Sequence, residues 1–180
     1  MNIFVATSMN DEIPNEFFIE AKELLNKLFE NNNLVFGACI SGIMGVSYKI
    51  AKEKNKKIIG INPEAYVKDF TKIVCEKEIT TKNLANRLLE LEKHSDVILV
   101  LPGGYGTVCE FLYMIESKRA GEFDKPIILY NKSGYFNTLI KFIKEMEDKK
   151  FAHEKTTSYY KVIDNEDDAL NYINLYNKKD

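Results

Sequence analysis

The chain has 180 residues, a hydrophobic content of 45%, a charged content of 29% and a formal net charge of −2. This length and composition are typical of a globular protein that folds as a single domain over residues 1–180. Acidic and basic residues are interleaved and no apolar run approaches 18 residues, so we expect no nucleic-acid partner and no association with a membrane.

Short apolar runs rich in β-branched residues alternate with amphipathic segments along the whole chain. In the first of these segments, the apolar positions from Phe17 to Phe29 are three and four residues apart, which predicts a helix. The expected strands are 3–6, 34–37, 57–61, 73–75, 97–101, 127–130 and 160–163. The expected helices are 17–29, 46–54, 80–95, 108–120, 136–148 and 166–176, whereas the connection 62–72 is not assigned.

This alternation predicts an α/β fold, a single-domain, Rossmann-like, doubly wound parallel sheet of about seven strands flanked by helices. The strand at 97–101 is the most apolar and is expected to be central. The helix at 80–95 is expected to turn Leu84, Leu88 and Leu91, together with Arg87, toward the interior. Ligands of such sheets bind outside the carboxyl ends of the strands, so the turns after the first, second and fifth strands should converge there.

The fifth strand runs into a glycine-rich turn, PGGYGT at 102–107, and an apolar helical pattern follows at once. The order of strand, glycine turn and helix is typical of an anion site, because free N–H groups at the helix N-terminus point at the ligand. No Gly-Lys-Ser/Thr follows and no GxGxxG lies after the first strand, which favours a nucleoside monophosphate over a triphosphate or a dinucleotide. The alternative interpretation is that the three glycines only form a tight turn between the strand and the helix. Tyr105 within this turn has two possible roles, to cover a bound phosphate or to close the turn by packing.

The nine residues PGGYGTVCE at 102–110 match the PGGxGTxxE signature of the LOG ("Lonely guy") family, which was formerly described as lysine decarboxylases. Arg87 lies fifteen residues before Pro102, where the family has its arginine. Further segments resemble the family at the same spacing: Gly121, DKP at 124–126, GYFNTL at 134–139 and SGIMG at 41–45. The resemblance covers essentially residues 3–150.

The resemblance implies a nucleoside 5′-monophosphate phosphoribohydrolase that releases a cytokinin or a similar base. It implies Arg87 and Glu110 as the catalytic pair, and a turn that holds the 5′-phosphate. The expected substrate-binding residues are Thr7, Ser8, Gly42, Gly45, Leu84, Gly103, Gly104, Tyr105, Gly106 and Thr107. It also implies a homodimer, with interface candidates near 111–115 and 136–143, and it implies neither a cofactor nor a metal.

The proposed chemistry agrees with these residue types. Cleavage of an N-glycosidic bond passes through an oxocarbenium-like state, which a carboxylate stabilises while it orients or deprotonates the attacking water. An arginine can hold phosphate or ribose oxygens and keep that carboxylate ionised.

Several positions depart from the family pattern, among them the first loop at 6–10, which reads ATSMN in place of G-S-S-S-G, and Leu88, which replaces a lysine after Arg87. Residues 37–40 read GACI where the family has three glycines, so Ala38 and Cys39 are expected to narrow this loop. Residues 116–119 read ESKR in place of a T-W-x-Q pattern, and Lys118 and Arg119 are expected on a solvated helix face. The second hypothesis is therefore a non-catalytic nucleotide or cofactor binder on the same scaffold, similar to a molybdenum-cofactor carrier.

The cysteines and histidines do not form a recognisable site. Cys39, Cys75 and Cys109 are odd in number and widely spaced, as expected of reduced thiols in a cytoplasmic protein. No leader-like segment follows Met1, which agrees with that location. Cys109 beside Glu110 is interpreted as a packing residue, and the isolated His94 and His153 predict no metal.

Overall fold

In the computed structural model, which describes residues 1–66, 73–152 and 156–177, seven strands form one parallel sheet. The strand order is β4-β3-β2-β1-β5-β6-β7. The strands are β1 (Asn2–Ala6), β2 (Asn33–Phe36), β3 (Ile58–Pro63), β4 (Lys77–Thr81), β5 (Val97–Val100), β6 (Ile127–Tyr130) and β7 (Lys161–Ile163). The helices are α1 (Asn15–Leu28), α2 (Gly42–Glu53), α3 (Leu84–His94), α4 (Tyr105–Arg119), α5 (Asn137–Asp148) and α6 (Glu166–Asn177), with a 3-10 turn η2 (Thr156–Ser158). No helix of the described residues is both long enough and apolar enough to cross a bilayer.

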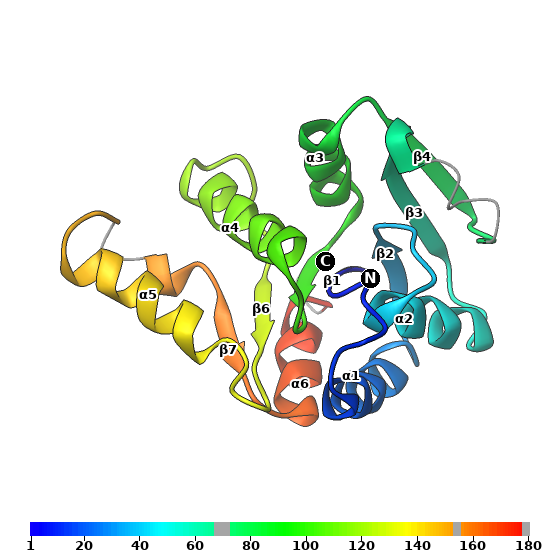
Figure 1. Cartoon of the computed structure of the whole chain (residues 1–180), viewed down its shortest axis with the longest axis horizontal. Helices are drawn as coiled ribbons and strands as arrows, with labels where there is room; N and C mark the ends of the chain where they lie inside the picture. Colours follow the sequence, from blue (N-terminus) through cyan, green and yellow to red (C-terminus); the bar gives the residue numbers. More distant parts are fainter. Residues whose placement is uncertain (67–72, 153–155, 178–180) are drawn as a thin grey trace.

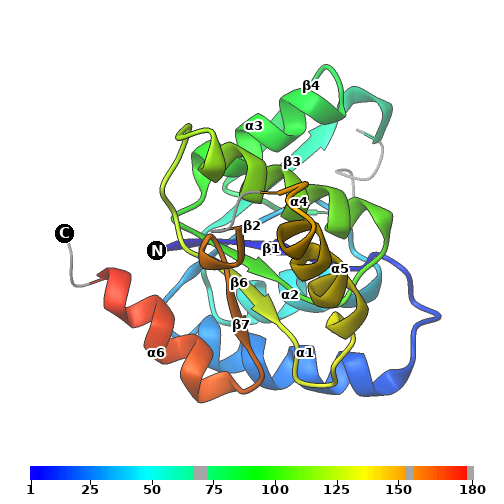
Figure 2. The same ribbon diagram turned by 90° about the vertical axis from the view of Figure 1, so that its left-hand side faces the viewer.

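Helices cover both faces of the sheet (Figures 1 and 2). Helices α1, α2 and α6 pack on one face, and α3, α4 and α5 pack on the other. Successive residues of β1 point to opposite faces, so Ile3 and Val5 join the first core while Phe4 and Ala6 join the second. The doubly wound parallel sheet predicted from the sequence is therefore confirmed.

The sheet grows in one direction from β1 to β4, and β5 then pairs with the other side of β1. Ala6 lies beside Val100 in this pair, and Leu101 N donates to Ala6 O at 2.9 Å. The loops after β1 and β5 diverge to opposite faces from this point. Such a switch in strand order opens a crevice at the carboxyl ends of the strands, where α/β proteins bind ligands.

The fourth strand differs from the prediction. Residues 73–75 are not a strand, and the strand is β4, whose Lys77, Glu78 and Thr80 are exposed. β4 is the edge strand of the sheet, so most of its side chains face water and leave no apolar run in the sequence. The nearby apolar Ile73 is buried although it belongs to no strand.

Helices α2 and α4 begin several residues earlier than expected, and α4 ends close to where it was expected. Helix α2 begins at Gly42 and α4 at Tyr105. The prediction started both helices later because each first turn carries glycine, which has a low helix propensity. Gly121 lies just past α4 with φ +77°, its N–H donates to Lys118 O, and Glu122 N donates to Ser117 O. This pair of bonds is a Schellman motif, which a left-handed glycine closes without strain.

Candidate active site

A cavity of about 480 Å³ lies at the switch point, over the carboxyl ends of β5, β1, β2 and β3. Its volume is within the range of roughly 300–1,000 Å³ that small-molecule sites occupy. The turns after the first, second and fifth strands meet there, as the sequence predicted. Nine of the predicted site residues line the cavity: Thr7, Ser8, Leu84, Arg87, Gly104, Tyr105, Gly106, Thr107 and Glu110.

Arg87 and Glu110 form an ion pair in the wall of this cavity. Arg87 Nη1 donates to Glu110 Oε1 at 2.7 Å, and the two side chains are only 13% and 6% exposed. Arg87 Nε donates to Ile61 O at the end of β3, at 3.2 Å. The guanidinium is therefore held in one orientation by a strand carbonyl and a carboxylate together.

Local structure places both partners of the pair. Asn83 precedes α3 and its side chain accepts a hydrogen bond from Asn86 N, which fixes the start of the helix that carries Arg87. Glu110 lies in the second turn of α4. A Cβ built on Gly37 would lie 2.1 Å from Arg87 Nη2, so only glycine at the end of β2 leaves room for the guanidinium.

Burial dominates the electrostatics of Glu110. Removal from water raises the pKa of this carboxyl above its ordinary value, and the charge and hydrogen bond of Arg87 oppose that shift. A carboxylate with an elevated pKa is a better proton acceptor than an exposed glutamate, and such a shift inside a cleft is typical of a functional residue.

The glycine-rich turn leaves the N-terminus of α4 open. Gly104 is the N-cap residue and supplies no side chain to the first N–H groups of the helix. A Cβ on Gly104 or on Gly106 would meet no protein atom within 4 Å, and neither residue has a positive φ. Neither packing nor backbone conformation therefore requires glycine at 104 and 106, whereas the close approach of a ligand would require it.

Gly103 has a different role in the same turn. A Cβ there would lie 2.1 Å from Thr107 Oγ1, so Gly103 packs beneath the buried Thr107 and does not border the cavity. Tyr105 is 98% exposed at the cavity edge, so it does not close the turn by packing.

The loop after β1 is tied to the glycine-rich turn. Thr7 Oγ1 and Ser8 N both donate to Pro102 O, at 3.1 and 3.2 Å. Ser8 Oγ accepts a hydrogen bond from Asn10 N at 3.0 Å. The Thr7 hydroxyl and the Ser8 backbone N–H therefore hold the two loops in register, whereas the Ser8 hydroxyl fixes its own loop. Both residues border the cavity, and their contact with a substrate stays a prediction.

The second loop packs differently from the expectation. Ala38 has a left-handed φ of 52° and is fully buried in the core, so its methyl group does not narrow the cavity. Cys39 does border the cavity. Gly42 and Gly45 do not: a Cβ would lie 2.6 Å from Ser8 O at Gly42 and 2.1 Å from Ile40 O at Gly45. Close packing of backbones explains both glycines, and their predicted contact with substrate remains untested.

Leu84 corrects the prediction for α3. It is the first residue of the helix and is 59% exposed beside the cavity, whereas Leu91 is fully buried. Sequence reasoning missed the wall that β3 contributes, where Asn62, Pro63 and Tyr66 line the cavity. These residues belong to the connection 62–72, for which the sequence predicts no helix or strand. Residues 67–72 of that connection lie outside the described residues.

The other candidates form no second site of this kind. The described residues contain no cluster of three or more potential metal ligands, and His153 lies outside them. The three cysteines are unpaired. Arg119 is bound to Glu116 on the exposed face of α4, away from the cavity. An open groove of about 1330 Å³ beside α6 and β7 contains neither member of the Arg87–Glu110 pair and none of the other predicted site residues.

Comparisons with known proteins identify relatives and folds. A family model described as "Possible lysine decarboxylase" matches residues 44–173. The cytokinin riboside 5′-monophosphate phosphoribohydrolase LOG3 of Arabidopsis thaliana is 34% identical over 133 residues, which are 73% of this chain and 62% of that protein. LOG5 of the same plant is 31% identical over 157 residues, 87% of this chain and 68% of that protein. The matched region thus spans about two thirds of the length of these curated relatives.

Solved structures with the same fold have low sequence identity. The molybdenum cofactor carrier protein of Chlamydomonas reinhardtii superposes with a TM-score of 0.71 at 19% identity, over 99% of this chain and 98% of the other. The molybdenum cofactor binding protein of Rippkaea orientalis gives a TM-score of 0.70 at 18% identity, over 96% and 94%. At this identity the likeness concerns the fold alone.

Proposed function

Because the chain belongs to the LOG family, we propose that it hydrolyses the N-glycosidic bond of a nucleoside 5′-monophosphate. The products are ribose 5-phosphate and the free base, and cytokinin riboside monophosphates and AMP are candidate substrates. The observation that carries the proposal is the buried Arg87–Glu110 pair in a cavity that also holds the open N-terminus of α4.

Each end of such a substrate has a matching group in the cavity. The 5′-phosphate binds the first N–H groups of α4 at Gly104 to Thr107, where the helix dipole and the absent Cβ atoms favour a close anion. Arg87 holds ribose or phosphate oxygens through guanidinium N–H groups other than the Nε bound to Ile61 O.

Glu110 acts at the anomeric carbon. As the bond from C1′ to the base nitrogen breaks, positive charge develops on the ribose and the nearby carboxylate stabilises it. Glu110 accepts a proton from the attacking water, whose oxygen bonds to C1′. The electron pair of the broken bond stays on the base nitrogen, which takes up a proton, and Glu110 gives its proton back, so one water is consumed for each base released.

We also propose that the protein is a homodimer in the cytoplasm. Phe111, Met114 and Ile115 are buried in the chain's own core, so the interface candidates narrow to exposed neighbours. Leu112 on α4 and Phe142 on α5 are 39% and 57% exposed. Sedimentation of the wild type and of Phe142→Ser tests this part, with a shift of the variant toward monomer as the expected result.

The activity is tested by incubating purified protein with AMP, CMP, GMP and isopentenyl-AMP while free base and ribose 5-phosphate are quantified. The proposal predicts equal amounts of both products and no inorganic phosphate. Nucleotides that raise the melting temperature without any base release would instead favour the non-catalytic binder.

A further inference from the structure

Asn62 carries a polar group that the proposed chemistry does not use. It is only 5% exposed, it lines the cavity at the end of β3, and its Nδ2 donates to Ala38 O at 3.4 Å. Its Oδ1 accepts no hydrogen bond from any residue that the structure describes. The Oδ1 atom is not among the fully enclosed atoms without a partner, so in the free cavity water can solvate it. A ligand that displaces this water must supply a donor in its place, or the acceptor is left without a hydrogen bond.

The order of groups across the cavity places Asn62 opposite the phosphate end. The α4 N-terminus follows β5, Gly37 next to the Arg87 guanidinium follows β2, and Asn62 is the next-to-last residue of β3. Three strand spacings separate β5 from β3, about 14 Å at the usual distance between neighbouring strands. A nucleotide with its phosphate at α4 and its ribose at the Arg87–Glu110 pair therefore directs its base toward Asn62.

Several apolar residues line the cavity together with Asn62: Met44, Pro63, Tyr66 and Leu84. Apolar contacts accept any flat base, so they give little discrimination between bases. A single acceptor in such a wall discriminates strongly, because a base that lacks a donor there leaves the acceptor unpaired.

We propose that Asn62 Oδ1 accepts a hydrogen bond from an N–H group on the outer edge of the base, and so selects nucleotides that carry an amino group there, such as 6-aminopurines. The orientation of the ligand rests on the proposed function. The selection itself concerns binding and can be measured without turnover.

Asn62 also supports the loop after β2, because its bond to Ala38 O meets a residue with a left-handed φ of 52°. Two variants separate the roles. Asn62→Leu removes both the acceptor and the bond to Ala38. Asn62→Asp loses the bond to Ala38 but keeps an acceptor toward the base.

The experiment measures affinity by calorimetry in a Glu110→Gln background, so that the nucleotide is not consumed. The two probes are AMP and purine riboside 5′-monophosphate, which has hydrogen in place of the 6-amino group. AMP is expected to bind about tenfold more tightly, the difference made by one hydrogen bond. Asn62→Leu should abolish this preference, whereas Asn62→Asp should retain it even if both affinities fall.

Equal affinity for the two nucleotides, a preference that survives in Asn62→Leu, or binding of neither nucleotide would overturn the proposal. If Asn62 only supported the loop, each variant would lower the affinities for AMP and for purine riboside 5′-monophosphate by the same factor. If the preference behaves as expected but wild-type protein releases no adenine from AMP, the proposed hydrolysis fails while recognition of the base by Asn62 stands.

Discussion

Two glutamates in this protein each pair with a cation, and their environments shift their pKa values in opposite directions. Glu110 meets Arg87 at 2.7 Å in the cavity, and burial raises its pKa. Glu166 meets Lys132 at 2.6 Å at the start of α6, and its pKa falls to about 2. An ion pair alone therefore does not determine how a carboxylate titrates.

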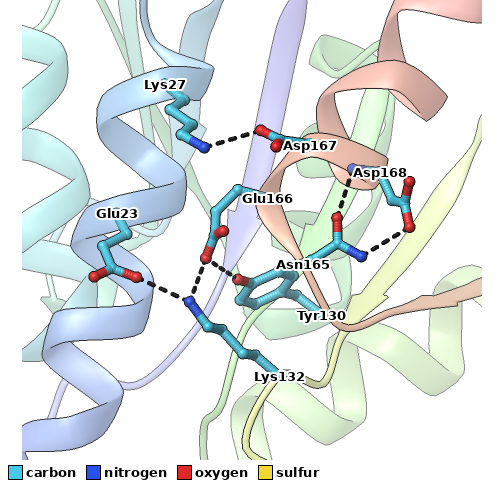
Figure 3. Close-up of polar contacts among 8 residues, drawn as sticks. All are labelled: Glu23, Lys27, Tyr130, Lys132, Asn165, Glu166, Asp167 and Asp168. Atoms are coloured by element: carbon cyan, nitrogen blue, oxygen red, sulfur yellow. Dashed lines mark hydrogen bonds and ion pairs between the residues drawn. The ribbon is translucent and has the colours of Figure 1, made fainter.

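The environment of Glu166 favours its charge. Lys132 Nζ and Tyr130 Oη both donate to Glu166 Oε1, at 2.6 and 2.7 Å, and Lys132 also reaches Glu23 on α1 (Figure 3). Beside them, Lys27 on α1 donates to Asp167 on α6 at 2.9 Å. These contacts fasten α6 to α1 and to the end of β6.

Glu110 has fewer groups to stabilise its charge. Among the described residues its only side-chain hydrogen-bond partner is Arg87, and the carboxylate side chain is only 6% exposed. A glutamate thus keeps its charge where donors surround it, as at position 166, and has a raised pKa where one cation only partly offsets its burial, as at position 110. This contrast agrees with the assignment of Glu110 to the chemistry and of Glu166 to the attachment of α6.

The largest expected effect comes from removing a cation. Arg87→Ala leaves Glu110 buried and unpaired, so we expect a loss of about 3–5 kcal/mol in the free energy of unfolding near pH 7. The matched change Lys132→Ala should cost only about 1 kcal/mol, because Lys132 is 34% exposed and Glu166 keeps Tyr130. Urea denaturation of both variants measures this difference, and equal losses would contradict the contrast.

The next effect concerns the room that Gly37 leaves for Arg87. Gly37→Ala places a Cβ against Nη2 and should lower kcat/KM for base release about tenfold or more, because small misplacements of a catalytic group are costly. Gly121→Ala is the control. Its φ of +77° predicts a stability loss of about 1 kcal/mol with unchanged kcat/KM. Full activity in Gly37→Ala would argue against the role of Arg87.

A smaller effect is expected at Glu166. Its pKa is depressed in the folded state, so its contribution is present above pH 4.5 and is lost as the pH falls toward about 2. Glu166→Gln should therefore lower the free energy of unfolding by about 1–2 kcal/mol near pH 7, and the difference from the wild type should shrink in acid. Denaturant titrations across this range measure it; a difference that does not depend on pH would count against the ion pair.

The smallest expected effect is a shift of the acid limb of the pH–rate profile to higher pH. Because burial raises the pKa of Glu110, its ionised form should disappear at a pH above the ordinary value of 4.5. Activity should then fall in a range where Glu166 remains charged and the protein remains folded. Parallel profiles of kcat/KM and of circular dichroism test this order, and loss of both signals at the same pH would contradict it.

Much of the fold follows from local pattern, and the exceptions have physical reasons. The central strands β1 and β5 are buried on both faces, so their sequences are continuous apolar runs. The edge strand β4 has no such run and was misplaced by a few residues. Helix starts at Gly42 and Tyr105 were missed because their first turns carry glycine, which is typical of a turn rather than of a helix.

For the site, the sequence predicted which loops meet but not how their atoms interact. The contact between Arg87 and Glu110 joins residues 23 positions apart on two helices, and only the family resemblance linked them beforehand. Asn62 escaped notice because one asparagine before a proline is typical of an ordinary turn. The role proposed for Asn62 depends on its burial and on an Oδ1 atom without a hydrogen-bond donor, and no local sequence pattern encodes either property.

The central claim is that the buried, Arg87-paired Glu110 carries out the hydrolysis. The most direct test compares adenine release from AMP by the wild type, Glu110→Gln and Glu166→Gln under identical conditions. The account predicts that Glu166→Gln releases adenine as fast as the wild type, while Glu110→Gln is slower by about a hundredfold or more with its fold intact. Turnover by Glu110→Gln within a few-fold of the wild type would contradict the account.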